Sequence, residues 1–173
     1  MRNEVAGGLD PARPVQRGSD LAVPLIEDLL GEGRSVSFEV DGHSMTPFIR
    51  RGDRVTVRPL RTRPSFGDVL VVVADARRLT VHRHVGWADG LIVPRGDCAP
   101  APDPAVPLER VLGVLTRVDR QDRRVRAGLG PERRVIAWLS RIGLLARIAR
   151  LHARLGRAAP SAQRKRRGAN RER

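Results

Sequence analysis

The stretch SVSFEVDGHSMTPFIRRGDRVTVR, residues 35–58, decides the fold of this 173-residue chain. Residues 35–40 and 54–58 alternate apolar and polar side chains, which is typical of β-strands with one buried and one solvated face. The loop between them carries Ser44 directly after the first strand and ends in a Gly52-Asp53 turn. This order predicts a serine hydroxyl at an exposed strand end.

The strand pattern continues to about residue 126. Further strands are predicted at 69–73, 79–85, 91–93, 111–118 and 123–127, with a turn near Asp75-Ala76. Before them, Ser19 can cap a short helix that Gly31 ends. After Gly130-Pro131 the apolar residues recur with the spacing of an α-helix. They form one stripe on residues 135, 138, 139 and 142 and a second on 144, 145, 148, 151 and 155. Because the stripe changes side at Gly143, two short amphipathic helices or one kinked helix are expected.

The charge of +14 is concentrated at the C-terminal end of the chain. Residues 131–173 contain 13 basic and two acidic side chains, so the rest of the chain is nearly balanced. We expect a mobile leader over 1–18, a β domain over 19–128, an amphipathic helical segment over 131–157 and a disordered basic tail over 158–173.

Apolar runs and cysteines limit the class of protein. The longest apolar run, 69–74, is too short for a membrane-spanning helix or a secretory signal. The single cysteine, Cys98, excludes an internal disulfide framework and is expected to be a buried structural thiol. No metal or cofactor is implied. The sequence therefore predicts a cytoplasmic protein, with a peripheral position on the inner face of a membrane as an option.

Ser44 is a candidate nucleophile whose backbone N–H can also serve as an oxyanion donor. A serine needs a base within about 3 Å to be activated. An isolated serine in a turn is more often an ordinary solvent-exposed residue, so the assignment depends on the residues around it.

Four short motifs follow one another in a set order: Gly-x-Ser-Met-x-Pro at 42–47, Arg-x-Gly-Asp-x-Val-x-Val at 50–57, Gly-Asp-Val-Leu-Val-Val at 67–72 and His-Arg-x-Val-Gly at 82–86. Together they resemble the signal peptidase I and LexA-type serine peptidase superfamily, over roughly 35–118. The resemblance implies a mainly β catalytic domain of coiled sheets, here with a short N-terminal helix and a C-terminal amphipathic helical tail. It also implies cleavage of a peptide bond in a protein or peptide precursor.

The base is predicted by the resemblance and by counting lysines. The only lysine of the chain is Lys165, so a Ser–Lys dyad within the β domain is excluded. His82, followed by Arg83, resembles the His-Arg pair of the endoplasmic-reticulum and archaeal-type branch. His84 competes as the base, because residues two apart on a strand face the same side.

The remaining candidates are acids that could orient the histidine and residues that could contact the substrate. Either Asp97 or Asp103 is expected to orient the histidine, and the sequence leaves the choice open. Met45, Pro47 and His84 are candidate substrate contacts. The alternative to an endopeptidase is a non-catalytic relative that binds a peptide with the same fold.

The basic segment 131–173 has three interpretations. It can lie on an anionic membrane, contact nucleic acid, or pack its apolar stripes on the β domain or a partner. Nucleic acid is the weakest of these, because aromatic residues for base stacking are scarce.

Overall fold

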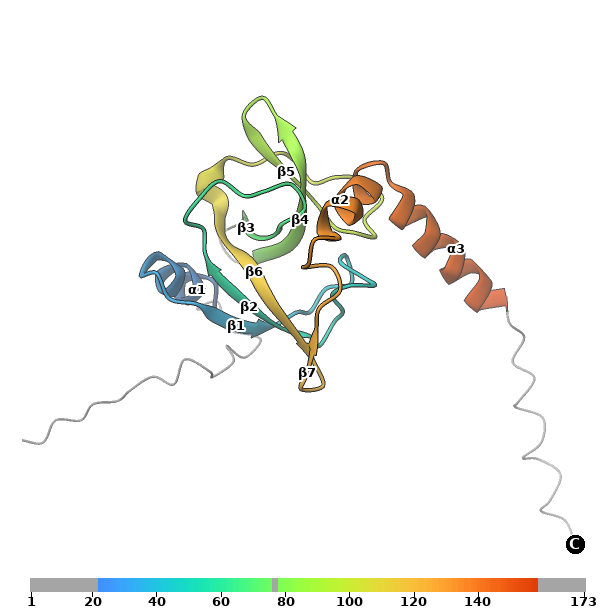
Figure 1. The fold of residues 1–173 in the computed structure, drawn as a ribbon, viewed down its shortest axis with the longest axis horizontal. Coiled ribbons are helices and arrows are strands. Elements are labelled where there is room, and N and C mark those ends of the chain that lie inside the picture. The colour runs from blue at the N-terminus through green and yellow to red at the C-terminus, as the bar shows by residue number, and fades with distance from the viewer. Residues whose placement is uncertain (1–21, 76–77, 159–173) are drawn as a thin grey trace, which may run out of the picture.

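The computed structural model describes residues 22–75 and 78–158, which form one coiled antiparallel sheet with three helices around it (Figure 1). The strands are β1 (Val36–Glu39), β2 (Arg54–Pro59), β3 (Val69–Asp75), β4 (Arg78–Ala88), β5 (Leu91–Arg95), β6 (Val111–Arg120) and β7 (Arg123–Val125). Their order in the sheet is β1-β2-β6-β3-β4-β5, with β7 paired to β6. The predicted mainly β class is confirmed.

The helices lie at the two ends of the described chain. They are α1 (Ala22–Gly31), α2 (Arg133–Arg141) and α3 (Leu144–Ala158), and a short 3-10 turn, η1 (Leu108–Arg110), precedes β6. The predicted break at Gly143 is confirmed: this residue has φ +74° and separates α2 from α3. The leader, Ser19, residue 76 of the predicted turn and residues 159–173 lie outside the described residues.

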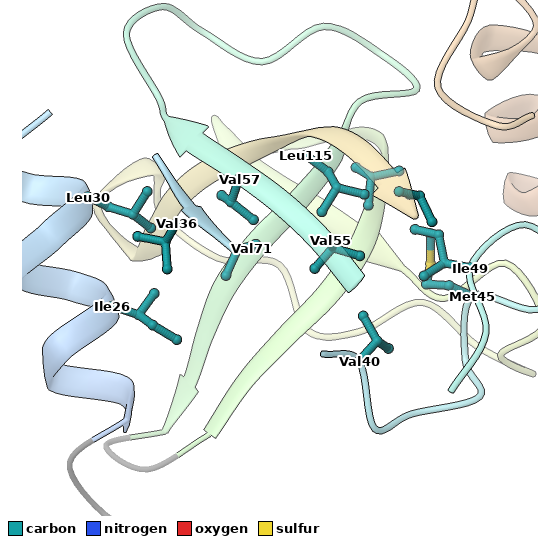
Figure 2. Close-up of a cluster of buried hydrophobic side chains, with 12 residues drawn as sticks. Ile26, Leu30, Val36, Val40, Met45, Ile49, Val55, Val57, Val71 and Leu115 are labelled. Carbon is teal, nitrogen blue, oxygen red and sulfur yellow. The ribbon is translucent and has the colours of Figure 1, made fainter. Parts of the chain in front are cut away.

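The main core fills the inside of the coiled sheet. Val55 and Val57 of β2 are completely buried there, and Ile26 and Leu30 of α1 close one side (Figure 2). At the other side of the same cluster lies Met45, from the loop that follows β1. The serine-bearing loop is therefore attached to the hydrophobic core.

Strand β6 joins the two halves of the sheet. It pairs with β2 on one edge and with β3 on the other. Gly113 allows this close approach, because a Cβ there would collide with the carbonyl oxygen of Arg58. Without β6, no hydrogen-bonded strand would connect the β1–β2 pair with the β3–β4–β5 part.

The packing of helix α2 differs from one of the three interpretations of the basic segment. Helix α2 packs on β4, but its inner face consists of Ile136, Ala137 and Ser140. The apolar stripe that includes Val135 and Trp138 faces solvent instead. The interpretation in which this stripe packs on the β domain is therefore wrong. None of the helices over 22–158 is long and apolar enough to cross a bilayer.

Candidate active site

The loop that carries Ser44 is a compact turn between β1 and β2. The N–H of Thr46 donates to the carbonyl of His43, and the N–H of Ile49 donates to the carbonyl of Met45. The Met45 and Ile49 side chains are 2% and 1% exposed and belong to the core. Buried apolar side chains and local hydrogen bonds thus fix the backbone on both sides of Ser44, while Ser44 itself is only half-buried.

His82 on β4 lies opposite this loop. Its Nε2 is 2.8 Å from the Ser44 Oγ, although the two residues are 38 positions apart. This distance is a normal hydrogen bond between a hydroxyl and an imidazole nitrogen. The two groups are therefore placed so that the imidazole can accept the serine proton.

Asp103 contacts the other nitrogen of the same imidazole. Its Oδ2 forms a hydrogen bond with His82 Nδ1. The Asp103 N–H donates to the carbonyl of Pro94 at 3.0 Å, and Val106 exchanges two hydrogen bonds with Ile92. These hydrogen bonds hold the segment after β5 against β5, so the Asp103 carboxylate has a fixed direction.

Asp97, the other candidate acid, interacts with Arg83 instead. The guanidinium donates to both carboxylate oxygens, from Nε at 2.8 Å and from Nη2 at 2.7 Å, and both side chains are fully buried. Burial raises the pKa of Asp97, and the Arg83 hydrogen bonds offset part of that shift. Of the two candidates, only Asp103 has a hydrogen bond to His82 within the described residues.

His84 lies away from the serine. Its Nδ1 and Nε2 face the carbonyl oxygens of Ser65 and Gly86 at 3.1 and 3.0 Å, and the ring is fully buried beside Trp87. Residues two apart on a strand are separated by more than 6 Å, so only one of them can reach Ser44. His84 is therefore neither a second base nor a surface for the substrate.

A loop after β5 packs against the backbone of Ser44, and no sequence pattern predicts this contact. A Cβ on Gly96 would lie 2.7 Å from the Ser44 Cβ, so only glycine fits there. The Cys98 N–H donates to the Ser44 carbonyl at 2.9 Å, and its half-buried thiol donates to the carbonyl of His43 at 3.0 Å. A Gly-Asp pair such as Gly96-Asp97 is typical of a turn, and a contact between residues far apart in the sequence leaves no local pattern.

A cavity of about 310 Å³ opens beside the Ser44–His82 pair. Apart from these two residues its walls are mostly apolar and come from α1, β1 and β4 and from Met45. Met45 thus lies in the core and also reaches this cavity. Pro47 is exposed and does not line this cavity.

Asp53 anchors the end of the serine-bearing loop. Its carboxylate accepts from Arg120 Nε at 2.8 Å, from Arg120 Nη2 at 2.7 Å and from the Arg50 N–H at 2.8 Å. Arg120 also donates to the carbonyl of Phe48. Burial alone would raise the pKa of Asp53, but the Arg120 and Arg50 hydrogen bonds outweigh burial, so the pKa is lowered.

We expect Asp53→Asn to destabilise the fold by about 2 kcal/mol near neutral pH. A lowered pKa means that the carboxylate stabilises the folded state above about pH 4 and loses this effect as the pH falls through the folded-state value. The difference in Tm between wild type and variant should therefore shrink between pH 5 and pH 3. Thermal unfolding across this range measures it, with Asp89→Asn at an exposed turn as the control. A difference that stays constant with pH would contradict the assignment.

The described residues offer no ready metal centre: within 22–75 and 78–158, no group of three or more His, Cys, Asp or Glu side chains is arranged to hold an ion.

A family model for Peptidase S24-like proteins matches residues 2–90, just over half of the chain. The chain belongs to the Peptidase S24-like family. This S24-like domain is thus a member of the LexA and signal peptidase superfamily, as the motifs predict. No curated protein matches the chain.

The S24-like match covers part of the site. It includes Ser44 and His82 and ends before Asp97 and Asp103. Family membership suggests a serine peptidase acting on a protein substrate. The type of base and the residue that orients it are separate questions.

Proposed function

We propose that this protein is a serine endopeptidase that uses a Ser44–His82–Asp103 triad to cleave a protein or peptide precursor. The observation that carries the proposal is the chain of contacts from Ser44 Oγ to His82 Nε2, at 2.8 Å, and from His82 Nδ1 to the Asp103 carboxylate. The absence of lysine before residue 165 supports a histidine base, as in the endoplasmic-reticulum and archaeal-type branch.

The geometry supports acyl transfer in two stages. Ser44 Oγ attacks the scissile carbonyl carbon while its proton moves to His82 Nε2, which forms a C–O bond and a tetrahedral oxyanion. The C–N bond then breaks, and His82 returns the proton to the leaving amine. Water next attacks the ester carbonyl and gives a proton to His82. The C–O bond to Ser44 breaks, Ser44 Oγ regains a proton from His82, and a carboxylic acid is released, which loses its proton to solvent as a carboxylate.

Two further groups support this chemistry. Asp103 accepts the Nδ1–H, which keeps Nε2 free to accept a proton and stabilises the imidazolium that forms. The Ser44 N–H has no acceptor among the described residues, so it is available to the developing oxyanion. The apolar cavity beside Ser44 favours a substrate with an apolar side chain next to the scissile bond.

The test is a comparison of protein N-termini by mass spectrometry in cells that make either the wild-type chain or Ser44→Ala. We expect a set of N-termini that Ser44→Ala abolishes and that Ser65→Ala retains, because Ser65 is an exposed serine with no hydrogen bond to Ser44 or His82 among the described residues. The new N-termini would also define the residues on each side of the cleaved bond. Identical N-termini in all three samples, with every variant folded and abundant, would contradict the proposal and favour a non-catalytic peptide-binding protein.

A further inference from the structure

Helix α2 presents an apolar surface on the side away from the sheet. Val135, Trp138 and Ile142 are 60%, 56% and 48% exposed. Their spacing of three and four residues puts them on one side of the helix axis. The opposite side, which includes the fully buried Ala137, packs on β4. Helix α2 therefore packs on the sheet with one side and exposes its apolar stripe on the other.

Helix α3, beyond Gly143, carries a second row of exposed apolar side chains. Leu144, Ile148 and Leu151 are 37%, 44% and 56% exposed and recur at four and three residues. Figure 1 shows α3 leading away from the sheet. We call the six exposed residues on the two helices the outer stripe: Val135, Trp138, Ile142, Leu144, Ile148 and Leu151. Clustered large apolar side chains on a protein surface indicate an interaction site.

The charges beside the outer stripe all have one sign. The segment 133–158 contains seven arginines and no acidic residue. Arg134 and Arg141 of α2 and Arg147 and Arg150 of α3 are exposed. A basic helix with a Trp- and Leu-rich face has the composition of helices that lie in the interface of a lipid bilayer.

We propose that the outer stripe docks on an anionic membrane surface. The apolar side chains would enter the boundary between headgroups and acyl chains, while the arginines would contact lipid phosphates. Nucleic acid would engage the arginines and leave the outer stripe in water. A second copy of the chain would bring two arginine-rich helix pairs together, and their repulsion would oppose association. Anionic lipid is the partner that satisfies both the charge and the apolar surface.

The experiment uses the full chain carrying Trp87→Phe, so that Trp138 becomes the only tryptophan. Vesicles of phosphatidylcholine containing about 30% phosphatidylglycerol are compared with vesicles of pure phosphatidylcholine. We expect the anionic vesicles to sediment the protein and to shift the Trp138 emission to shorter wavelength. Binding should be at least tenfold weaker to pure phosphatidylcholine and should also weaken at 0.5 M NaCl.

Surface variants separate the contribution of the arginines to vesicle binding from that of the apolar side chains. Arg147→Gln with Arg150→Gln should weaken binding to anionic vesicles by about 10- to 30-fold, and Trp138→Ser with Leu151→Ser should weaken it by a similar factor. The matched controls are Arg117→Gln and Leu25→Ser, which remove an exposed arginine and an exposed leucine elsewhere and should leave binding unchanged. These sites are exposed, and unchanged circular dichroism verifies the fold.

Three results would overturn the proposal. The first is an unchanged Trp138 emission and no sedimentation with anionic vesicles. The second is binding that both controls reduce as much as the stripe variants do. The third is tight binding to duplex DNA, or formation of a dimer, that the stripe variants abolish while vesicle binding is absent.

Discussion

Asp103→Asn is expected to reduce kcat for peptide hydrolysis by about 10⁴-fold with little change in Tm. The asparagine amide can donate to His82 Nδ1, which leaves the ring proton on Nε2. In that tautomer the imidazole cannot accept the Ser44 proton across the 2.8 Å contact. The Asp103 side chain is 31% exposed, so the fold should tolerate the uncharged replacement.

The assay uses a peptide that spans a cleavage site found for the wild-type chain. Glu109→Gln, an exposed acid in η1, is the matched control and should retain full activity. Combining Asp103→Asn with His82→Ala should cost no more than His82→Ala alone, because the residues act as one unit. An Asp103→Asn enzyme within about threefold of wild type would show that another group orients His82.

Arg83→Ala is expected to destabilise the protein by about 3–5 kcal/mol and to lower Tm by about 10 °C or more. Arg83 is fully buried and makes four hydrogen bonds: two to Asp97 and one each to the carbonyl oxygens of Gly67 and Gly128. Removing the guanidinium leaves a buried carboxylate and two carbonyls without a donor. Thermal and urea unfolding measure the loss.

A matched control and a rescue make this prediction specific. Arg117→Ala removes an arginine that pairs with Asp119 at the surface, and it should leave Tm unchanged. Arg83→Met combined with Asp97→Leu should be more stable than Arg83→Ala, because no unpaired charge remains buried. Wild-type stability in Arg83→Ala would contradict the role assigned to this buried ion pair.

The strands and helices are largely predictable because each depends on a local pattern. Alternation of apolar residues marks β1 and β2, and the change of stripe at Gly143 marks the break between α2 and α3. Which side of α2 is buried is not predictable from the apolar pattern. The inner face uses the small residues Ala137 and Ser140, which allow close packing on β4. The larger apolar side chains remain outside.

The site is less predictable than the fold. The pairing of Ser44 with His82 followed from the resemblance, since no local rule relates residues 38 positions apart. Choosing Asp103 over Asp97 required the path of the chain after β5, where the Asp103 N–H bonds to Pro94. In the sequence, Arg83 stands out only as part of a His-Arg motif. Its burial depends on Asp97 and on two carbonyl oxygens from distant loops.

Because β6 connects the two halves of the sheet, these halves can join only after β6 has been translated. A nascent chain that has emerged as far as residue 110 already contains Ser44, His82 and Asp103. It still lacks the strand that bonds to both β2 and β3. Non-local strand pairing of this kind is slow and comes late in folding. Until residues 111–120 leave the ribosome, the Ser44 loop and His82 remain on separate halves of the sheet, so the proposed peptidase activity should appear only late in translation.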